Sequence, residues 1–178
     1  MHHSSFATAL ATALIVLGPT LPRAEISRYA PGAEWQQADG MTTLVSTLEG
    51  WLDAQADWPR RDGVPRVRLV SAWQAAVRRD ATTSFQPGRL RGLYDPDRSE
   101  ILLVRPWDPS NALDVSVLLH ELVHHRQAPH HWYCPAAQEL PAYRLQEVWL
   151  VEQGLSIDVN WVAVVLDAGC TPRDIHPE

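Results

Sequence analysis

The sequence predicts an α+β fold in which several helices pack against a small β-sheet. Three stretches, residues 41–57, 111–127 and 138–152, repeat apolar residues three or four positions apart, as amphipathic helices do. Two short stretches, residues 90–94 and 100–104, flank turn-forming residues and predict a β-hairpin. With 178 residues, of which 46% are hydrophobic, the chain is long enough to bury the core of one domain.

The N-terminal residues 1–24 are expected to be a signal peptide or an N-terminal anchor, and residues 25–178 the globular domain. The apolar run of residues 6–17 is typical of the hydrophobic part of a signal peptide, and it is too short to span a bilayer. We therefore expect an exported protein, periplasmic or secreted, without stable membrane insertion after processing. Cys134 and Cys170 fit one disulfide in such a compartment, with two buried thiols as the alternative.

The first part of the domain contains predicted helices and strands that carry no evident catalytic or ligand-binding motif. Residues 25–40 lack periodicity and are expected to be irregular, and the helix of residues 41–57 should end at Trp58-Pro59. Residues 65–70 alternate as a half-buried strand does, and residues 73–79 predict a short helix. The hairpin of residues 90–104 follows, and a loop over residues 107–110 leads into the next helix.

The helix of residues 111–127 carries the motif H-E-x-x-H, formed by His120, Glu121 and His124. At about 100° per residue the two histidines lie about 40° apart on one face. The opposite arc is apolar and consists of Val115, Leu118, Leu119, Leu122 and Val123. Two neutral imidazoles in this arrangement bind Zn²⁺, a third protein ligand completes the set, and a water takes the open position. Glu121 is then placed to accept the proton of that water as it attacks a carbonyl.

The third ligand is expected to be Glu139, fifteen residues after His124 and at the entrance of the helix that continues to residue 152. Pro141 suits the first turn of that helix. A loop at this spacing can fold the second helix against the first and bring a carboxylate to the metal.

Other ligands remain open at this point. His130 stands six residues after His124, which is the metzincin spacing, but Gln127 replaces the glycine of that motif and Pro129 intrudes. His131 and Glu147 are the remaining alternatives.

The sequences His-Glu-Leu-Val-His and Glu-Leu-Pro-Ala-Tyr, from residues 120 and 139, resemble those of the gluzincin clan of zinc metallopeptidases. The resemblance covers residues 90–150. It implies a zincin-like domain that holds Zn²⁺ through His120, His124 and Glu139, with Glu121 as the general base. In zinc peptidases a strand near the metal commonly offers its edge to an extended substrate, and here either strand of the hairpin can supply that edge.

Several residues near the motif have weaker assignments. Tyr143, one turn after Glu139, is a candidate catalytic residue that donates to a developing oxyanion, or else it orients a ligand. Asp114 is a candidate acceptor for a ligating histidine. His125 is expected at the surface or beside the ligands, and Arg126 is expected to extend to solvent from the apolar arc. A last helix is predicted over residues 157–168.

The composition narrows the function. The net charge of −6 argues against a nucleic-acid partner, and all fifteen basic residues are arginines, which excludes lysine Schiff-base chemistry. The eight tryptophans are expected mainly in the core. The sequence thus predicts an exported zinc metallopeptidase that hydrolyses peptide or related amide bonds of a peptide or protein substrate. The alternative is a non-catalytic, exported zinc-binding or interaction module, and no oligomeric state is predicted.

Overall fold

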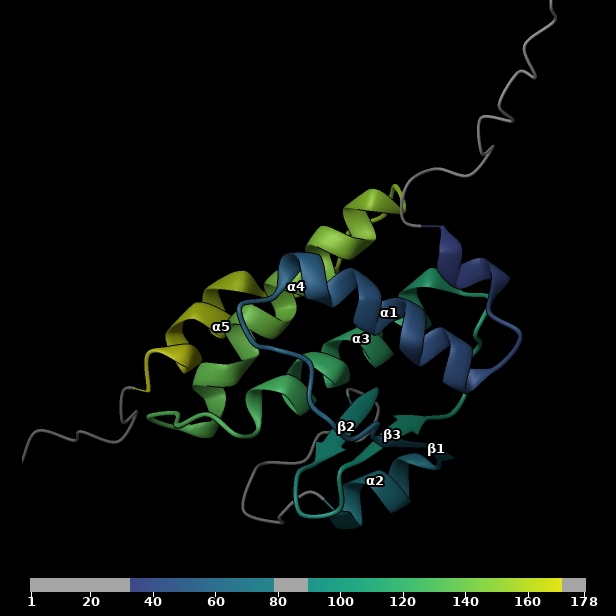
Figure 1. The fold of residues 1–178 in the computed structure, drawn as a ribbon. Helices are drawn as coiled ribbons and strands as arrows, with labels where there is room; N and C mark the ends of the chain where they lie inside the picture. The colour runs from purple at the N-terminus through teal and green to yellow at the C-terminus, as the bar shows by residue number, and fades with distance from the viewer. Residues whose placement is uncertain (1–32, 79–89, 171–178) are drawn as a thin grey trace, which may run out of the picture.

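A computed structural model of the chain describes residues 33–78 and 90–170. The predicted signal peptide therefore lies outside the described residues. The elements follow in the order η1 Glu34–Gln37, α1 Met41–Gln55, β1 Arg66–Val70, α2 Ala72–Arg78, β2 Gly92–Asp95, β3 Glu100–Val104, α3 Ala112–Gln127, η2 Pro135–Gln138, α4 Glu139–Glu152 and α5 Trp161–Ala168. The predicted α+β class is confirmed, as Figure 1 shows.

The three-stranded sheet has the order β1-β3-β2, with β1 parallel and β2 antiparallel to the central strand β3. All five residues of β3 are buried because helices cover both faces of the sheet. Ile101 and Leu103 join the main core with α1, α3 and α4, whereas Leu102 and Val104 form a smaller cluster with α2. Figure 1 shows α2 on one side of the sheet and the other helices on the opposite side. The strand β2 is consequently an edge strand that lies beside α3.

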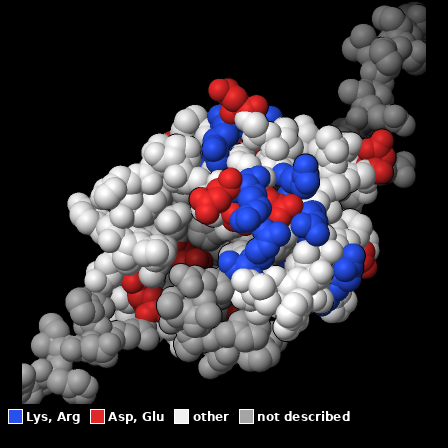
Figure 2. All heavy atoms as spheres, turned by 90° about the horizontal axis from the view of Figure 1, so that it is seen from below, with Lys and Arg blue, Asp and Glu red and all other residues white. Residues whose placement is uncertain are grey.

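The outer face of α2 and the adjacent strands carries charged side chains of both signs. Figure 2, which views the molecule from the side of α2, shows arginines and acidic residues in contact there. Arg68 lies 3.4 Å from Glu100, and Arg78 lies 3.1 Å from Asp95. These arginines are therefore partnered by carboxylates.

The helix predicted over residues 111–127 is confirmed as α3. The side chain of Asn111 accepts a hydrogen bond from the backbone N–H of Leu113 at 2.9 Å, which satisfies one of the free donors at the helix start. The five residues of the predicted apolar arc are completely buried. This burial fixes the rotation of α3, so that the opposite face, with its two histidines, turns toward α4.

Arg126, on the same apolar arc, corrects the expectation that its side chain extends to solvent. Only 1% of the residue is exposed, and its Nε donates a 2.8 Å hydrogen bond to the Glu49 carboxylate of α1. Its Nη2 also donates to Asp53 at 2.7 Å, and its Nη1 donates to the Trp58 carbonyl at 3.1 Å. A buried guanidinium is tolerated here because α1 brings a buried carboxylate to it.

One additional helix and one helix boundary also differ from the sequence predictions. Residues 34–37 form the 3-10 helix η1 rather than irregular chain, with Trp35 buried. The last helix, α5, begins at Trp161 rather than at residue 157 because the Asn160 side chain accepts a hydrogen bond from the Ala163 N–H at 3.1 Å. Ile157 instead packs against the main core. No helix in the described ranges is both long and apolar enough to cross a bilayer.

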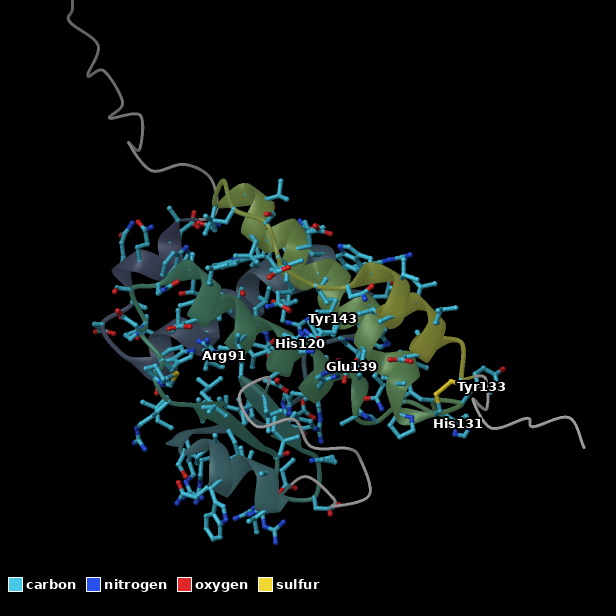
Figure 3. All side chains as sticks on the ribbon, turned by 180° about the vertical axis from the view of Figure 1, so that it is seen from behind. Arg91, His120, His131, Tyr133, Glu139 and Tyr143 are labelled. Atoms are coloured by element: carbon cyan, nitrogen blue, oxygen red, sulfur yellow. A yellow bond between two sulfur atoms is a disulfide. The ribbon has the colours of Figure 1, made fainter. Side chains whose placement is uncertain are left out.

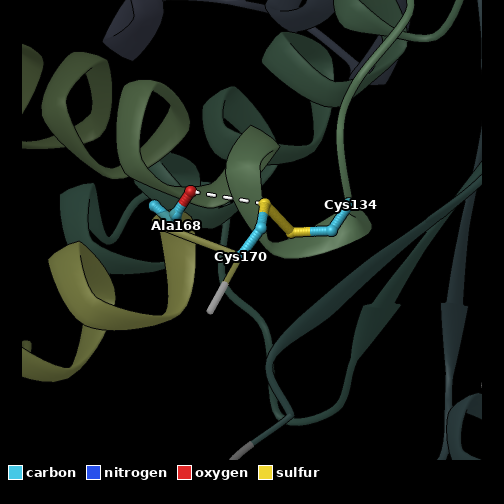
Figure 4. Close-up of a disulfide and its surroundings, with 3 residues drawn as sticks. All are labelled: Cys134, Ala168 and Cys170. Carbon is cyan, nitrogen blue, oxygen red and sulfur yellow. Dashed lines mark hydrogen bonds between the residues drawn. A yellow bond between two sulfur atoms is a disulfide. The ribbon is translucent and has the colours of Figure 1, made fainter. Parts of the chain in front are cut away.

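The predicted disulfide between Cys134 and Cys170 is confirmed, and it fastens the end of α5 to the loop before α4. In Figure 4 the Cys170 sulfur lies 3.5 Å from the carbonyl oxygen of Ala168, within the same turn. No residue of α5 is buried. The covalent bond therefore supplies an attachment that side-chain burial does not.

Replacing both cysteines with serine is expected to release α5 rather than to unfold the domain. Closing a loop with a sequence separation of 36 stabilises a folded chain by up to about 4 kcal/mol in the chain-entropy estimate. Hydrogen exchange read by mass spectrometry should become faster over residues 161–168 and stay unchanged over α3. Equal loss of protection in both helices would show that the bond supports the whole domain.

Candidate metal centre

His120 and His124 lie one turn apart on α3 and direct their Nε2 atoms toward each other at 3.0 Å. Their ring centroids are 4.7 Å apart. Both side chains are largely shielded from solvent, with exposed fractions of 8% and 12%. Two shielded imidazole nitrogens at this separation are suited to share a bound cation.

A glutamine side chain orients each of these imidazoles. The Oε1 atom of Gln146, from α4, lies 3.1 Å from Nδ1 of His120, and the Oε1 atom of Gln127 lies 2.9 Å from Nδ1 of His124. An amide oxygen only accepts, so each Nδ1 carries a hydrogen, and in the neutral form of each imidazole Nε2 presents its lone pair. Gln146 is itself held, because its Nε2 donates to Ser116 at 2.9 Å.

Glu139 completes a group of three possible ligands at the first residue of α4. Its carboxylate oxygens lie 3.3 Å from His120 Nε2 and 3.6 Å from His124 Nε2. The three ligand atoms lie within 4.8 Å of one another. Figure 3 shows His120 and Glu139 between α3 and α4. The loop and the 3-10 turn η2 reverse the chain between the two helices, which brings residues nineteen positions apart together.

The electrostatics of this group favour a positive charge between the imidazoles. Burial acts to lower the pKa of His124, but the hydrogen bond and charge of Glu139 and the charge of Glu121 outweigh it and raise that pKa to about 9. Burial acts to raise the pKa of Glu139, yet hydrogen bonds from His120 and His124 hold it well below its usual range. A proton or a divalent cation can supply the charge that these carboxylates favour.

Glu121 is buried against the edge strand β2. Burial raises the pKa of its carboxyl, while the neighbouring imidazoles and a hydrogen bond from the backbone N–H of Tyr94 oppose the shift. A Cβ at Gly92 would lie only 2.5 Å from Oε1 of Glu121. Glycine at position 92 therefore makes room for the carboxylate.

The register of the hairpin explains why Tyr94 can donate to Glu121. Arg91 and Val104 form a hydrogen-bonded pair, because the Val104 N–H donates to the Arg91 carbonyl at 2.8 Å. Hydrogen-bonded and non-hydrogen-bonded pairs alternate along antiparallel strands, so Gly92 and Tyr94 belong to non-hydrogen-bonded pairs. Their backbone groups consequently point away from β3, toward the outer edge of the sheet. Of the two hairpin strands, β2 therefore carries the free edge, because β3 is the central strand.

Tyr143 lies one turn after Glu139 and packs its ring on that of His120, with centroids 4.5 Å apart. Figure 3 shows both residues beside Glu139. The ring contact places Tyr143 at the wall of the group of three ligands, on the side of α4.

A family model described as a domain of unknown function, DUF6647, matches residues 37–178. The chain belongs to the DUF6647 family. No curated protein sequence and no solved structure matches it. His120, Glu121, His124, Glu139 and Tyr143 all lie inside the matched part of this DUF6647 chain. The description of the family assigns no activity, so the geometry of the site carries the chemical inference.

The alternative ligands of this DUF6647 chain lie apart from the group. His130 and His131 are exposed in the loop after α3, and the group found among the described residues contains neither them nor Glu147. Figure 3 shows His131 and Tyr133 at the edge of the molecule, near the disulfide. The metzincin spacing therefore does not bring His130 to the other two histidines.

The assignment of Asp114 is wrong, and so is the surface alternative for His125. Asp114 accepts hydrogen bonds from the Arg91 side chain and from the Asp108 N–H at 2.9 Å, not from a ligating histidine. His125 is buried rather than at the surface. Its Nε2 lies 2.9 Å from the Gly63 carbonyl oxygen and its Nδ1 lies 3.0 Å from the Tyr94 hydroxyl. This residue consequently joins α3 to β2 and to the chain before β1.

Sequence reasoning missed three supporting residues. Gln146 stands seven residues after Glu139, which puts both on one face of α4, and Gln127 stands three residues after His124. Each spacing places the glutamine on the same helix face as a candidate ligand, where its side chain can orient a histidine. Gly92 had no such signal, since its role depends on how closely β2 approaches Glu121.

Proposed function

We propose that this chain is a zinc-dependent hydrolase of peptide or related amide bonds. The observation that carries the proposal is the convergence of two Nε2 atoms and the Glu139 carboxylate, with the buried Glu121 beside them. Two imidazoles and one carboxylate form a donor set typical of catalytic zinc, and orienting hydrogen bonds to ligating histidines are typical of such sites. A zincin-like fold is part of the proposal.

The residues fit the bound ion in number as well as in kind. His120, His124 and Glu139 would hold it, and no further histidine, cysteine or carboxylate of the described residues joins the group. Three protein ligands are typical of a catalytic zinc ion, whereas structural zinc usually has four. This count favours the hydrolase over the non-catalytic zinc-binding module.

The chain's own residues supply the proton transfers. When bound, Zn²⁺ polarises the substrate carbonyl and lowers the pKa of water. Glu121 accepts the proton of the attacking water and delivers it to the leaving amine. Burial raises the pKa of Glu121, which suits a group that takes up a proton and releases it again. Tyr143 supports the ring of His120 and supplies an O–H donor for the developing oxyanion.

The outer edge of β2 supports an extended peptide as the substrate. The N–H and carbonyl of Gly92 and the carbonyl of Tyr94 point outward there, while the Tyr94 N–H binds Glu121. A peptide that adds to this edge as a further strand would pass directly beside the general base. The class of partner proposed is therefore a peptide or an unfolded protein segment, processed outside the cytoplasm.

Elemental analysis of the purified protein tests the ligand set. The wild type is expected to retain about one zinc per chain, Glu139→Ala to lose it, and Glu121→Gln to keep it. Glu147→Ala, on the same helix but outside the ligand group, is the matched control and should keep the zinc. A wild type that takes up no zinc when zinc is supplied contradicts both the hydrolase and the zinc-binding module.

Gly92→Ala should impair hydrolysis without removing zinc. The new Cβ would lie 2.5 Å from Oε1 of Glu121, so the carboxylate must move, and a displacement of about 1 Å can lower turnover on the order of 100-fold. The measurement is kcat/KM on a peptide that the zinc-loaded wild type cleaves. Gly63→Ala is the control, because a Cβ there meets no atom within 4 Å. Wild-type turnover by Gly92→Ala would show that Glu121 tolerates the shift.

A further inference from the structure

Arg61 lies in the loop between α1 and β1, and its guanidinium contacts both β2 and α3. The Nη1 atom donates to the Tyr94 hydroxyl at 2.9 Å and to the His125 carbonyl at 3.3 Å, and it lies 3.2 Å from Nδ1 of His125. The side chain is half-buried and forms no ion pair with a described carboxylate. Its charge-assisted hydrogen bonds therefore go to neutral groups of a strand and a helix that are far apart in the sequence.

His125 holds the Tyr94 hydroxyl together with Arg61. The Gly63 carbonyl oxygen only accepts, so Nε2 of His125, 2.9 Å away, carries a hydrogen. In the neutral imidazole Nδ1 then presents a lone pair to the Tyr94 hydroxyl at 3.0 Å. The two rings also pack edge to face, with centroids 5.4 Å apart. The hydroxyl thus accepts from Arg61 and donates to His125, which fixes the Tyr94 side chain against α3.

The same strand forms one wall around Glu121. Glu121 stands one turn before His125 on α3, so both side chains face β2. Gly92 of that strand approaches so closely that a Cβ on it would lie 2.5 Å from Oε1 of Glu121. The Tyr94 N–H, two residues along the strand, donates to the Glu121 carboxylate. The position of β2 relative to α3 therefore decides where this carboxylate can lie.

Burial holds β2 less firmly than it holds the rest of the sheet. The strand pairs only with β3, and all four of its residues are only partly buried. All five residues of β3, in contrast, are buried. Segments with few buried contacts open more readily than core strands do. The hydrogen bonds of Arg61 and His125 to Tyr94 are therefore placed where β2 most needs an attachment to α3.

We propose that Arg61 is a positioning residue for the general base: through the Tyr94 hydroxyl it holds β2 against α3, and β2 holds the Glu121 carboxylate in place. This inference rests on the proposed hydrolase function, in which Glu121 takes the proton of the attacking water. The hydrogen bonds of Arg61 go to Tyr94 and His125 and not to a candidate metal ligand. Arg61 therefore acts through the strand and not on the reacting atoms.

Residue-resolved hydrogen exchange of the full chain tests the attachment of β2 without a substrate. Arg61→Met keeps an unbranched side chain but has no donor, and it should speed exchange of the Tyr94 amide on the order of tenfold. The Leu93 amide, which faces β3, should exchange as in the wild type. Arg66→Met, at an exposed arginine of β1, is the matched control and should change neither amide. Unchanged exchange at Tyr94, or equal acceleration at both amides, would overturn the proposal.

A double-mutant cycle with zinc-loaded proteins tests the link to catalysis. Arg61→Met should lower kcat on the order of tenfold in the wild-type background. It should have no further effect in a Glu121→Gln background, where no base remains to be positioned. Equal losses in both backgrounds would show that Arg61 acts independently of Glu121, which contradicts the proposal. A zinc-loaded wild type that cleaves no peptide would instead contradict the hydrolase function, and the exchange of the Tyr94 amide would still decide whether Arg61 holds β2.

Discussion

Glu121→Gln is expected to lower kcat/KM for peptide hydrolysis on the order of 10²–10⁴-fold while the protein keeps its zinc. Glutamine fills nearly the same space against Gly92 but cannot accept the proton of the attacking water. The imidazoles keep their orientation because Gln146 and Gln127, not Glu121, hold them. The measurement compares the two zinc-loaded proteins on a quenched-fluorescence peptide cleaved by the wild type.

The control for this variant is Glu147→Gln, which makes the same chemical change on α4 outside the ligand group. It should retain wild-type kcat/KM. If Glu121→Gln cleaves the peptide as fast as Glu147→Gln does, Glu121 is not the general base. If a zinc-loaded wild type cleaves no peptide of a randomised pool, the hydrolase proposal gives way to the zinc-binding module.

Arg126→Met is expected to destabilise the domain by about 3 kcal/mol, the lower end for a broken buried ion pair, because the buried carboxylate of Glu49 keeps only the half-exposed Arg60, at 3.6 Å, as a cation. Denaturation by urea, followed through tryptophan fluorescence, measures the free energy of unfolding. The size of this effect follows from the pairing of two buried charges rather than from the loss of one side chain's volume.

The double variant Arg126→Met with Glu49→Leu provides the matched control. It removes both charges, so most of the lost stability should return, as it does when apolar residues replace a buried ion pair. If the double variant is as unstable as the sum of the two single variants, the charges act independently and the network of Arg126 is not what holds α1 to α3.

Local patterns predicted most of the elements correctly. The helix of residues 41–57 corresponds to α1, and the predicted hairpin corresponds to β2 and β3. The structure also brings the carboxylate of Glu139 beside both histidines, and its role as the third ligand stays a prediction. The correctly predicted helices and strands share one cause, because apolar periodicity, turn residues and helix caps all act within a few residues.

The expectations that were wrong depend on contacts between residues far apart in the sequence. Arg126 and Glu49 are separated by 77 positions, so no helical pattern could show that α1 supplies a buried partner for the guanidinium. His125 likewise meets Gly63 and Tyr94 from other parts of the chain. The parallel pairing of β1 with β3 is also long-range, and it leaves β2, rather than β3, at the edge beside Glu121.

The two glutamines of the metal centre connect α3 and α4 in both directions. Gln146 reaches from α4 to hold a histidine of α3, and Gln127 of α3 donates at 3.2 Å to the carbonyl of Gln138, the residue just before Glu139. A shift of either helix would therefore misalign a ligand on each of them at the same time. The arrangement of the candidate ligands is thus a property of the docked helix pair, and a bound ion would hold α3 and α4 together and be released only when the two helices separate.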